Sequence, residues 1–160
     1  MPLINNIPEN AQRLHPDSIK VSRITGSLVA LIPLGVSIFI GVASGNYWVP
    51  VIGAIVALLV FMVSFVYAKK SYDYSYYWLA DEGLYIQKGV LWRKKTLVPK
   101  NRVQHTDVSQ GPLERKYQLA KLTVHTAGTR DASVDLSGIA FDIANELRGY
   151  LLDEEMSDAV

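Results

Sequence analysis

The hydrophobic residues of this chain are concentrated between Ile24 and Ala68, a stretch in which no residue carries a charge. The turn-forming sequence Ser44-Gly45-Asn46 divides the stretch into two segments, 24–43 and 49–68. Each segment supplies the roughly 20 apolar residues that a helix needs to cross a hydrocarbon core about 30 Å thick. The pattern therefore predicts a hairpin of two antiparallel transmembrane helices. The small residues expected where these helices approach closely are Gly35, Gly41, Gly53 and Ala57.

The charges next to the hairpin predict its orientation. Arg13, Lys20 and Arg23 precede the first segment, Lys69 and Lys70 follow the second, and the loop between them is uncharged. The positive-inside rule then places both termini in the cytoplasm, so we expect a multi-pass protein of the inner (cytoplasmic) membrane. A cleaved signal peptide is disfavoured because a polar leader of more than 20 residues precedes the first segment.

The chain leaves the second segment through two cations and a run rich in aromatic residues. Lys69 and Lys70 are followed by five aromatic residues within 72–78. Such a sequence is typical of the headgroup region of a bilayer, and it also suits direct contact with lipid headgroups. The two interpretations are compatible, and both stay open.

From Tyr76 onward the hydrophobic pattern changes to a period of two, which predicts β-strands. The alternation is clear at 84–87, 122–125 and 133–136, and turn sequences at 81–83, 111–112 and 127–131 separate the strands as in an antiparallel meander. Val103 and Val108 fall on opposite parities, so that strand is expected to be bulged or short.

Helical spacing returns near the C-terminus and predicts an amphipathic helix, with Asp135 or Ser137 as its N-cap. These patterns divide the chain into an N-terminal segment (1–23), the hairpin (24–68), a domain (72–152) and an acidic tail (153–160) expected to fray. The residues with helical spacing are Ile139, Ile143, Leu147, Tyr150 and Leu151.

Composition narrows the classes of function. The chain of 160 residues has a net charge of +1, which argues against a nucleic-acid-binding protein. It contains no cysteine, so disulfides and thiolate chemistry are excluded. It also lacks a nucleophile elbow and a glycine-rich phosphate-binding motif. Enzymatic activity is therefore not expected, and the sequence names no catalytic residue and no cofactor.

Five sequence blocks resemble the membrane-anchored bacterial PH (pleckstrin-homology-like) domain family, the YdbS-like proteins, long classed as a domain of unknown function. The hairpin that precedes them is also typical of this family. The resemblance covers the chain from about Trp78 to the C-terminal helix. The blocks are DEGLYI (81–86), KGVLWRKK (88–95), VPKNRVQ (98–104), QGPLER (110–115) and LAKLTVHTAG (119–128).

The resemblance implies a PH-like fold, a bent antiparallel sheet or barrel of about seven strands capped by the C-terminal helix. It implies a binding module without catalytic residues or cofactors, which works beside another membrane protein, for example a larger relative with several PH-like domains. A homo-oligomer stays open. One departure is Gln118, where such sequences often carry glycine, and we expect the turn there to be less tight.

The first candidate site is the basic sequence Trp92-Arg93-Lys94-Lys95, which lies between two strand patterns. A basic hairpin tip with an exposed tryptophan suits an anionic membrane surface, where each cation contributes about 1 kcal/mol. The alternative is an ordinary hairpin in which Trp92 folds back onto the core. The sequence does not separate the two.

The second candidate site is a basic group, predicted to contact an anion or a partner, formed by Lys100, Arg102, Arg115 and Lys116. Arginine offers a planar fork for a phosphate or a carboxylate. Ion pairs with Asp107 or Glu114 are an equally good interpretation of these cations.

The three histidines, His15, His105 and His125, are scattered in the sequence and show no metal-binding spacing, so we expect no metal site. The leading hypothesis is a non-catalytic inner-membrane protein that presents a cytoplasmic PH-like domain to a protein partner, to anionic lipid headgroups, or to both. The alternative is an accessory subunit of an envelope transport or defence complex, which docks through its transmembrane helices.

Overall fold

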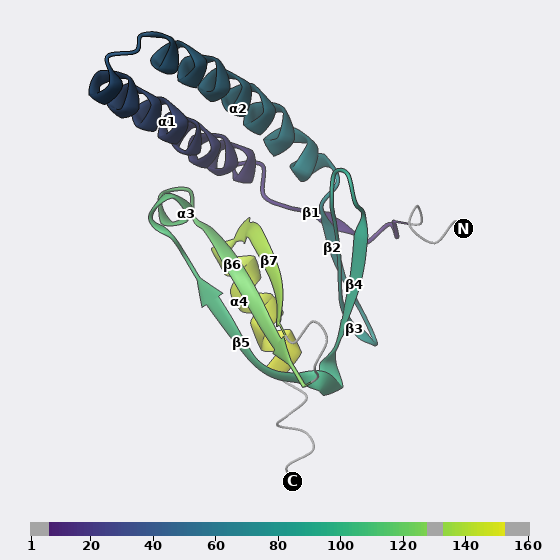
Figure 1. Ribbon diagram of the computed structural model, residues 1–160. Coiled ribbons are helices and arrows are strands. Elements are labelled where there is room, and N and C mark those ends of the chain that lie inside the picture. The colour runs from purple at the N-terminus through teal and green to yellow at the C-terminus, as the bar shows by residue number, and fades with distance from the viewer. Residues whose placement is uncertain (1–6, 128–132, 153–160) are drawn as a thin grey trace. The chain divides into compact units, whose positions relative to one another are not determined.

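The computed structural model describes residues 7–127 and 133–152, and its two compact units are considered separately (Figure 1). One unit is Ile19–Lys70, which holds most of two helices. The other unit, the domain, consists of the described residues on either side of this segment, 7–18, 71–127 and 133–152. The acidic tail and most of the turn predicted at 127–131 lie outside the described residues.

The predicted hairpin is confirmed. Helix α1 covers Ser18–Ser44 and helix α2 covers Trp48–Asp73, and both are long and apolar enough to cross a membrane. Each extends beyond its apolar segment by several polar residues at the end remote from the loop. These additional turns are helical because polar residues also satisfy backbone hydrogen bonding within a helix.

Small residues form the contact between α1 and α2. A Cβ atom added at Gly41 would overlap the Pro50 ring, and one added at Gly53 would overlap the Ser37 side chain. The expectation for these two glycines is confirmed. Gly35 is different, because a Cβ atom there would meet nothing within 4 Å among the described residues. Gly26, which faces Ser64, is a contact that the sequence analysis missed.

The domain contains two antiparallel sheets. In the four-stranded sheet the order is β1-β2-β3-β4, and in the three-stranded sheet it is β5-β6-β7. The strands of the first sheet are β1 (Gln12–Arg13), β2 (Tyr76–Ala80), β3 (Gly83–Lys88) and β4 (Lys94–Pro99). Those of the second are β5 (Val103–Ser109), β6 (Leu119–Thr126) and β7 (Ser133–Ala140).

One hydrophobic core joins both sheets and the C-terminal helix α4 (Phe141–Leu152). Alternate residues of the strands fill it, and α4 packs against β5, β6 and β7 (Figure 1). The predicted fold class, a helical hairpin followed by a PH-like antiparallel β-structure capped by a C-terminal helix, is therefore confirmed. The largest fully buried side chains are Leu84, Leu119, Leu122, Ile139, Val98 and Val124.

The N-terminal segment contributes to the domain. Gln12 and Arg13 pair with Tyr77 and Tyr76 at the edge of the first sheet, and Leu14 packs against the core. The Tyr77 hydroxyl donates a hydrogen bond to Gln12 Oε1 at 2.8 Å. A two-residue strand has no periodicity to detect, so the sequence analysis could not find it.

The start of the C-terminal helix was predicted wrongly. Ile139 belongs to β7, where it pairs with Ala120, and α4 begins at Phe141. Asp135 and Ser137 lie inside β7 and cap nothing. Their apolar neighbours fit both periods over this short distance, and pairing with β6 decides in favour of the strand. Of the two alternatives for the strand with Val103 and Val108, bulged or short, the bulge is correct, since the register shifts between Val103 and His105.

The turn at Gln118 keeps the conformation that favours glycine, which contradicts the expectation of a less tight turn. Gln118 has a φ of 53°, the only positive value of a non-glycine residue in the described part of the chain. Its carbonyl accepts a hydrogen bond from the Phe141 N–H at 3.0 Å, and its own N–H donates to the Arg115 carbonyl at 3.2 Å. These bonds hold a left-handed conformation that costs an L-residue about 1–2 kcal/mol.

Candidate functional sites

The first candidate site is the tip of the β3–β4 hairpin. Lys88 pairs with Lys94, which closes a loop of residues 89–93. Gly89 starts this loop with a φ of +126°, and a Cβ atom there would overlap the Trp92 carbonyl, so the turn needs glycine. The side chains of Leu91 and Trp92 are 85% and 89% exposed. The alternative in which Trp92 folds back onto the core is therefore wrong.

Arg93 and Lys95 of this tip lie against aromatic rings. The Arg93 guanidinium is 5.0 Å from the ring centre of Tyr74. Lys95 Nζ lies 4.7 Å from the Trp78 ring and 4.9 Å from the Tyr85 ring. Each contact of this kind contributes about 0.5–1 kcal/mol at an exposed site. The positive charges of Arg93 and Lys95 therefore have defined positions on the hairpin.

Strand register explains how these rings meet. Trp78 and Tyr85 are cross-strand partners, and their rings stack with centres 5.1 Å apart at an angle of 7°. Tyr85 pairs in turn with Leu97, two residues from Lys95, so Lys95 extends from the same face. The Tyr85 hydroxyl donates to Glu82 Oε2 at 2.7 Å, and this hydrogen bond raises the pKa of the phenol.

The tip lies at the end of the sheet where the chain enters the domain. Tyr76, the first residue of β2, is opposite Gln87, which is opposite Lys95. Tyr74, the ring under Arg93, directly follows the end of α2 at Asp73. Lys69 and Lys70, which were also predicted to contact lipid, are exposed residues near the C-terminal end of α2.

The second predicted basic group is split by the structure. Lys100 and Arg102 belong to the 3-10 helix η1 (Lys100–Arg102), whereas Arg115 and Lys116 belong to the short helix α3 (Pro112–Lys116). Strand β5 runs between them, and its 7 residues span about 23 Å. One anion cannot bind to all four cations, so the prediction of a single group is wrong.

The two halves of this basic group also have different surroundings. Lys100 Nζ lies 3.5 Å from the ring centre of Tyr150 in α4. The two carboxylates considered as partners have other contacts: Glu114 Oε2 accepts the Gly111 N–H at 2.7 Å, and Asp107 Oδ2 lies 3.3 Å from His125 Nε2. Glu114 thereby caps α3 and holds the helix that presents Arg115 and Lys116.

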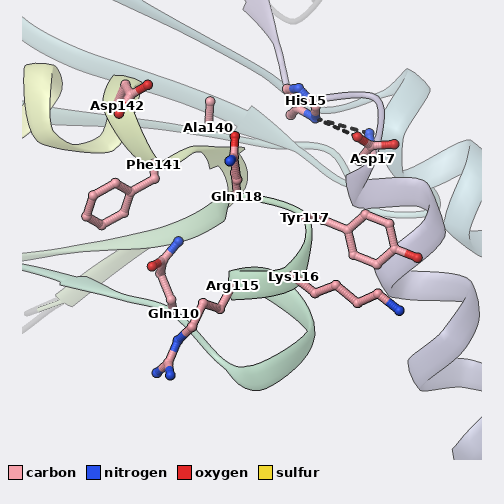
Figure 2. A pocket seen from close by; sticks show the side chains of 10 residues that line it. All are labelled: His15, Asp17, Gln110, Arg115, Lys116, Tyr117, Gln118, Ala140, Phe141 and Asp142. Carbon is pink, nitrogen blue, oxygen red and sulfur yellow. Dashed lines mark hydrogen bonds and ion pairs between the residues drawn. The ribbon is translucent and has the colours of Figure 1, made fainter.

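Arg115 and Lys116 line a cavity of about 640 Å³, the second candidate site (Figure 2). Asp17 and Asp142 are on the same lining, so the cavity carries charges of both signs. His15 Nδ1 accepts the Asp17 N–H at 3.2 Å, which fixes that corner. The cavity suits a polar ligand with both charge types. Its remaining lining residues are Gln110, Tyr117, Gln118, Ala140 and Phe141.

Sequence reasoning found two residues of this cavity and missed the rest, because the lining comes from the N-terminal segment, α3 and its flanks, and the β7–α4 junction. The histidines are also arranged differently from the prediction. His15 lines the cavity, whereas His105 and His125 are paired across β5 and β6. These two histidines, which are 20 positions apart in the sequence, are therefore neighbours on the sheet.

Comparison with known proteins defines the class. The family model described as bacterial PH domain matches residues 27–155, and the chain belongs to this family. The match begins inside α1, so the family unit includes most of the hairpin as well as the domain.

A particular relative supports the same assignment. The chain is 33% identical to the transmembrane protein YdbS of Bacillus subtilis (strain 168) over 127 residues, which cover 76% of this chain and 79% of that protein. No solved structure matches the chain significantly. The protein is therefore a membrane-associated, YdbS-like member of the bacterial PH domain family.

Proposed function

We propose that this protein is a non-catalytic binding module of the inner membrane, with both termini in the cytoplasm, and that its PH-like domain contacts anionic lipid headgroups through the β3–β4 tip. The observation that carries the proposal is the exposure of Trp92 and Leu91 beside three cations. Monomeric soluble surfaces seldom present a tryptophan and a leucine together at a loop tip unless something covers them.

The energetics favour a membrane as the surface that covers Trp92 and Leu91. Tryptophan prefers the headgroup region, where its ring is apolar on one side and its N–H can still be hydrated. Arg93, Lys94 and Lys95 would together contribute about 3 kcal/mol at an anionic surface, by the rule of about 1 kcal/mol per cation. Because this part is electrostatic, it falls with ionic strength.

Chain connectivity supports the same conclusion. Tyr74, which contacts Arg93, follows the last apolar residue of the second span, Ala68, by six positions. A span inserted in the bilayer would, through this short connection, keep the tip close to the membrane surface. A short tether raises the effective concentration of the second contact, so weak headgroup binding is sufficient.

A reconstitution experiment tests this proposal. The full chain is placed in nanodiscs of zwitterionic lipid with or without anionic lipid, and quenching of tryptophan fluorescence by brominated acyl chains is measured. The Trp92 contribution is the difference between wild type and Trp92→Phe. We expect this contribution to require anionic lipid and low salt, and to be lost in the triple variant Arg93→Ala, Lys94→Ala, Lys95→Ala.

The matched control is Arg115→Ala with Lys116→Ala, which removes two cations from the cavity and leaves the tip intact. Quenching should be unchanged in that variant. A Trp92 signal that ignores lipid charge, or that survives the triple substitution, contradicts the proposed contact. The intact chain is required, because a fragment starting at Tyr72 would lack β1 and Leu14.

A second candidate function, an accessory subunit that docks through its helices, is supported by one observation. Gly35 lies on α1 with nothing near its missing Cβ among the described residues, so another helix could approach there. The partner would be another membrane protein, for example a larger relative with several PH-like domains, or a second copy. Co-purification in mild detergent tests this, and Gly35→Leu should abolish the complex. A monomer alone contradicts it.

A further inference from the structure

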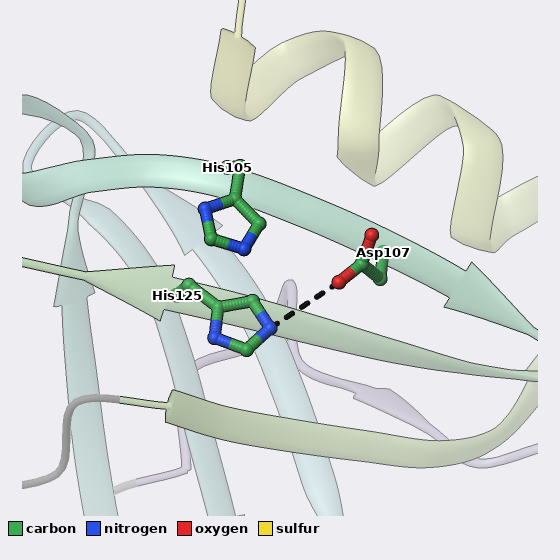
Figure 3. Close-up of side chains that lie close together, drawn as sticks. All are labelled: His105, Asp107 and His125. Carbon is green, nitrogen blue, oxygen red and sulfur yellow. Dashed lines mark ion pairs between the residues drawn. The ribbon is translucent and has the colours of Figure 1, made fainter.

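Three potential metal ligands are brought together on the β5–β6 ladder (Figure 3). His105 and Asp107 are two residues apart on β5 and therefore extend from the same face. His125 on β6 is the cross-strand partner of His105. One ligand atom from each residue lies within 4.8 Å of the other two.

The bulge in β5 is responsible for this arrangement. Val103 pairs with Thr126 and His105 pairs with His125, so two steps along β5 correspond to one step along β6. If the regular pairing that starts at Val103 and Thr126 continued without a bulge, Gln104 would be opposite His125. His105 would then extend from the face of the sheet opposite to that of His125. The bulge thus brings His105 and Asp107 to the face of the sheet that carries His125.

The distances are close to those of a metal site. Atoms bound to one tetrahedral Zn²⁺ at about 2.0–2.2 Å lie about 3.4 Å from each other. His125 Nε2 and Asp107 Oδ2 are 3.3 Å apart, which already meets this condition. The His105 ring is stacked on the His125 ring with centres 4.2 Å apart at 15°. The ligand nitrogen of His105 lies within 4.8 Å of both atoms, and because His105 is exposed, its side chain is free to rotate and close the remaining distance.

We propose that His105, Asp107 and His125 bind one divalent transition-metal ion, with Zn²⁺ as its representative. Two imidazoles and one carboxylate suit Zn²⁺, Ni²⁺ or Cu²⁺, whereas Mg²⁺ and Ca²⁺ prefer sites made of oxygen ligands. Three protein ligands leave the fourth position to water. The ion connects β5 to β6 beside the bulge, where the ladder is locally irregular.

The neighbouring charges do not compete for this role. Asp135, the carboxylate that faces Thr123 on the same side of the sheet, is engaged by Lys121 Nζ at 2.8 Å and by the Thr123 hydroxyl at 2.8 Å. The hydrogen bond from Lys121 lowers the pKa of Asp135. Asp107, by contrast, faces the two imidazoles.

Isothermal titration of the full chain with Zn²⁺ alone tests the proposal, using detergent-solubilised protein without a histidine tag. We expect one ion per chain. His105→Ala and His125→Ala should each weaken Zn²⁺ binding by more than about tenfold. Substituting residues that only hydrogen-bond to metal ligands already lowers metal affinity by about that factor. Asp107→Asn should weaken it too. The control His15→Ala retains the other two histidines and should bind as wild type does.

A second measurement uses wild type only and does not depend on the folding of variants. Zn²⁺ should shift the imidazole NMR signals of His105 and His125 and leave those of His15 unchanged. It should also raise the unfolding temperature of the domain, because the ion binds the folded state. Absence of saturable binding, unchanged binding in both alanine variants, or equal loss in His15→Ala would overturn the site.

Discussion

The hairpin and the domain use the same apolar residue types in opposite ways. In α1 and α2 the large side chains face outward, for example Phe39 at 75% and Val42 at 79% exposure. In the domain the large side chains are inside, for example Leu84 and Leu122 at 0%. The buried residues of the two helices are all small: Ala30, Ser37, Gly41, Gly53 and Ala68.

The difference indicates that the two regions suit different solvents. In water, burying large apolar side chains drives folding, at roughly 25 cal/mol per Å². In lipid, that driving force between helices is absent, and association depends on close packing of small residues. The outward-facing apolar surface of the hairpin is therefore suited to contact with a bilayer, and the sheets and α4 of the domain obtain their stability from a conventional core.

The largest expected effect contrasts two leucines. Leu122→Ala should destabilise the domain by about 2–5 kcal/mol, because Leu122 is fully buried between the sheets and α4 and the substitution leaves a cavity. Thermal unfolding in detergent, followed by the fluorescence of the buried Trp78, measures this. Leu58→Ala in the hairpin, where the leucine is 57% exposed, should change stability by less than about 0.5 kcal/mol. Equal effects would remove the distinction between the regions.

The second prediction replaces a small residue by a large one. Gly53→Leu should destabilise the helix pair by about 1–3 kcal/mol, since the added atoms overlap Ser37 and separate α1 from α2. Far-UV circular dichroism during thermal unfolding in detergent measures the loss. Gly35→Leu is the matched control, because its position is open among the described residues, and its unfolding should match that of wild type. A large loss in the control would mean that outward glycines also support the fold.

The smallest effect concerns a glycine that is missing. In the hairpin, glycine leaves space for the neighbouring helix. At position 118 of the domain, glycine would instead adopt the positive φ without steric cost. Gln118→Gly should stabilise the domain by up to about 1 kcal/mol, because it removes the cost of a positive φ. The unfolding temperature should rise. Tyr117→Gly, at a φ of −101°, is the control and should lower it. A fall with both variants would show that the left-handed conformation of Gln118 carries no strain.

Features that depend on neighbouring residues were predictable from the sequence. The hairpin follows from two uncharged runs of sufficient length, and most strands follow from alternation at their own positions. The bulge in β5 was detectable because Val103 and Val108 differ in parity. The tip cations were recognised because they are adjacent in the sequence, between two strands.

Features that depend on pairing between distant segments were not predictable in this way. The exposure of Trp92 depends on how the pairing of Lys88 with Lys94 closes the loop that contains it, and the ring contacts of Lys95 depend on the register of β2, β3 and β4. The cavity combines His15 with Arg115 and Asp142, and β1 joins residues 12 and 77.

The sequence by itself determined which region is apolar enough to cross a membrane, the fold class, and where the cations lie along the chain. These features depend on hydrophobicity, periodicity and charge, which belong to short stretches of chain. Only the tertiary structure decided which of these residues act together. It separated Lys100 and Arg102 from Arg115 and Lys116, and it joined His105 to His125. The physical reason is strand register: a shift by one residue reverses the face of every side chain, and long-range hydrogen bonding and core packing select it.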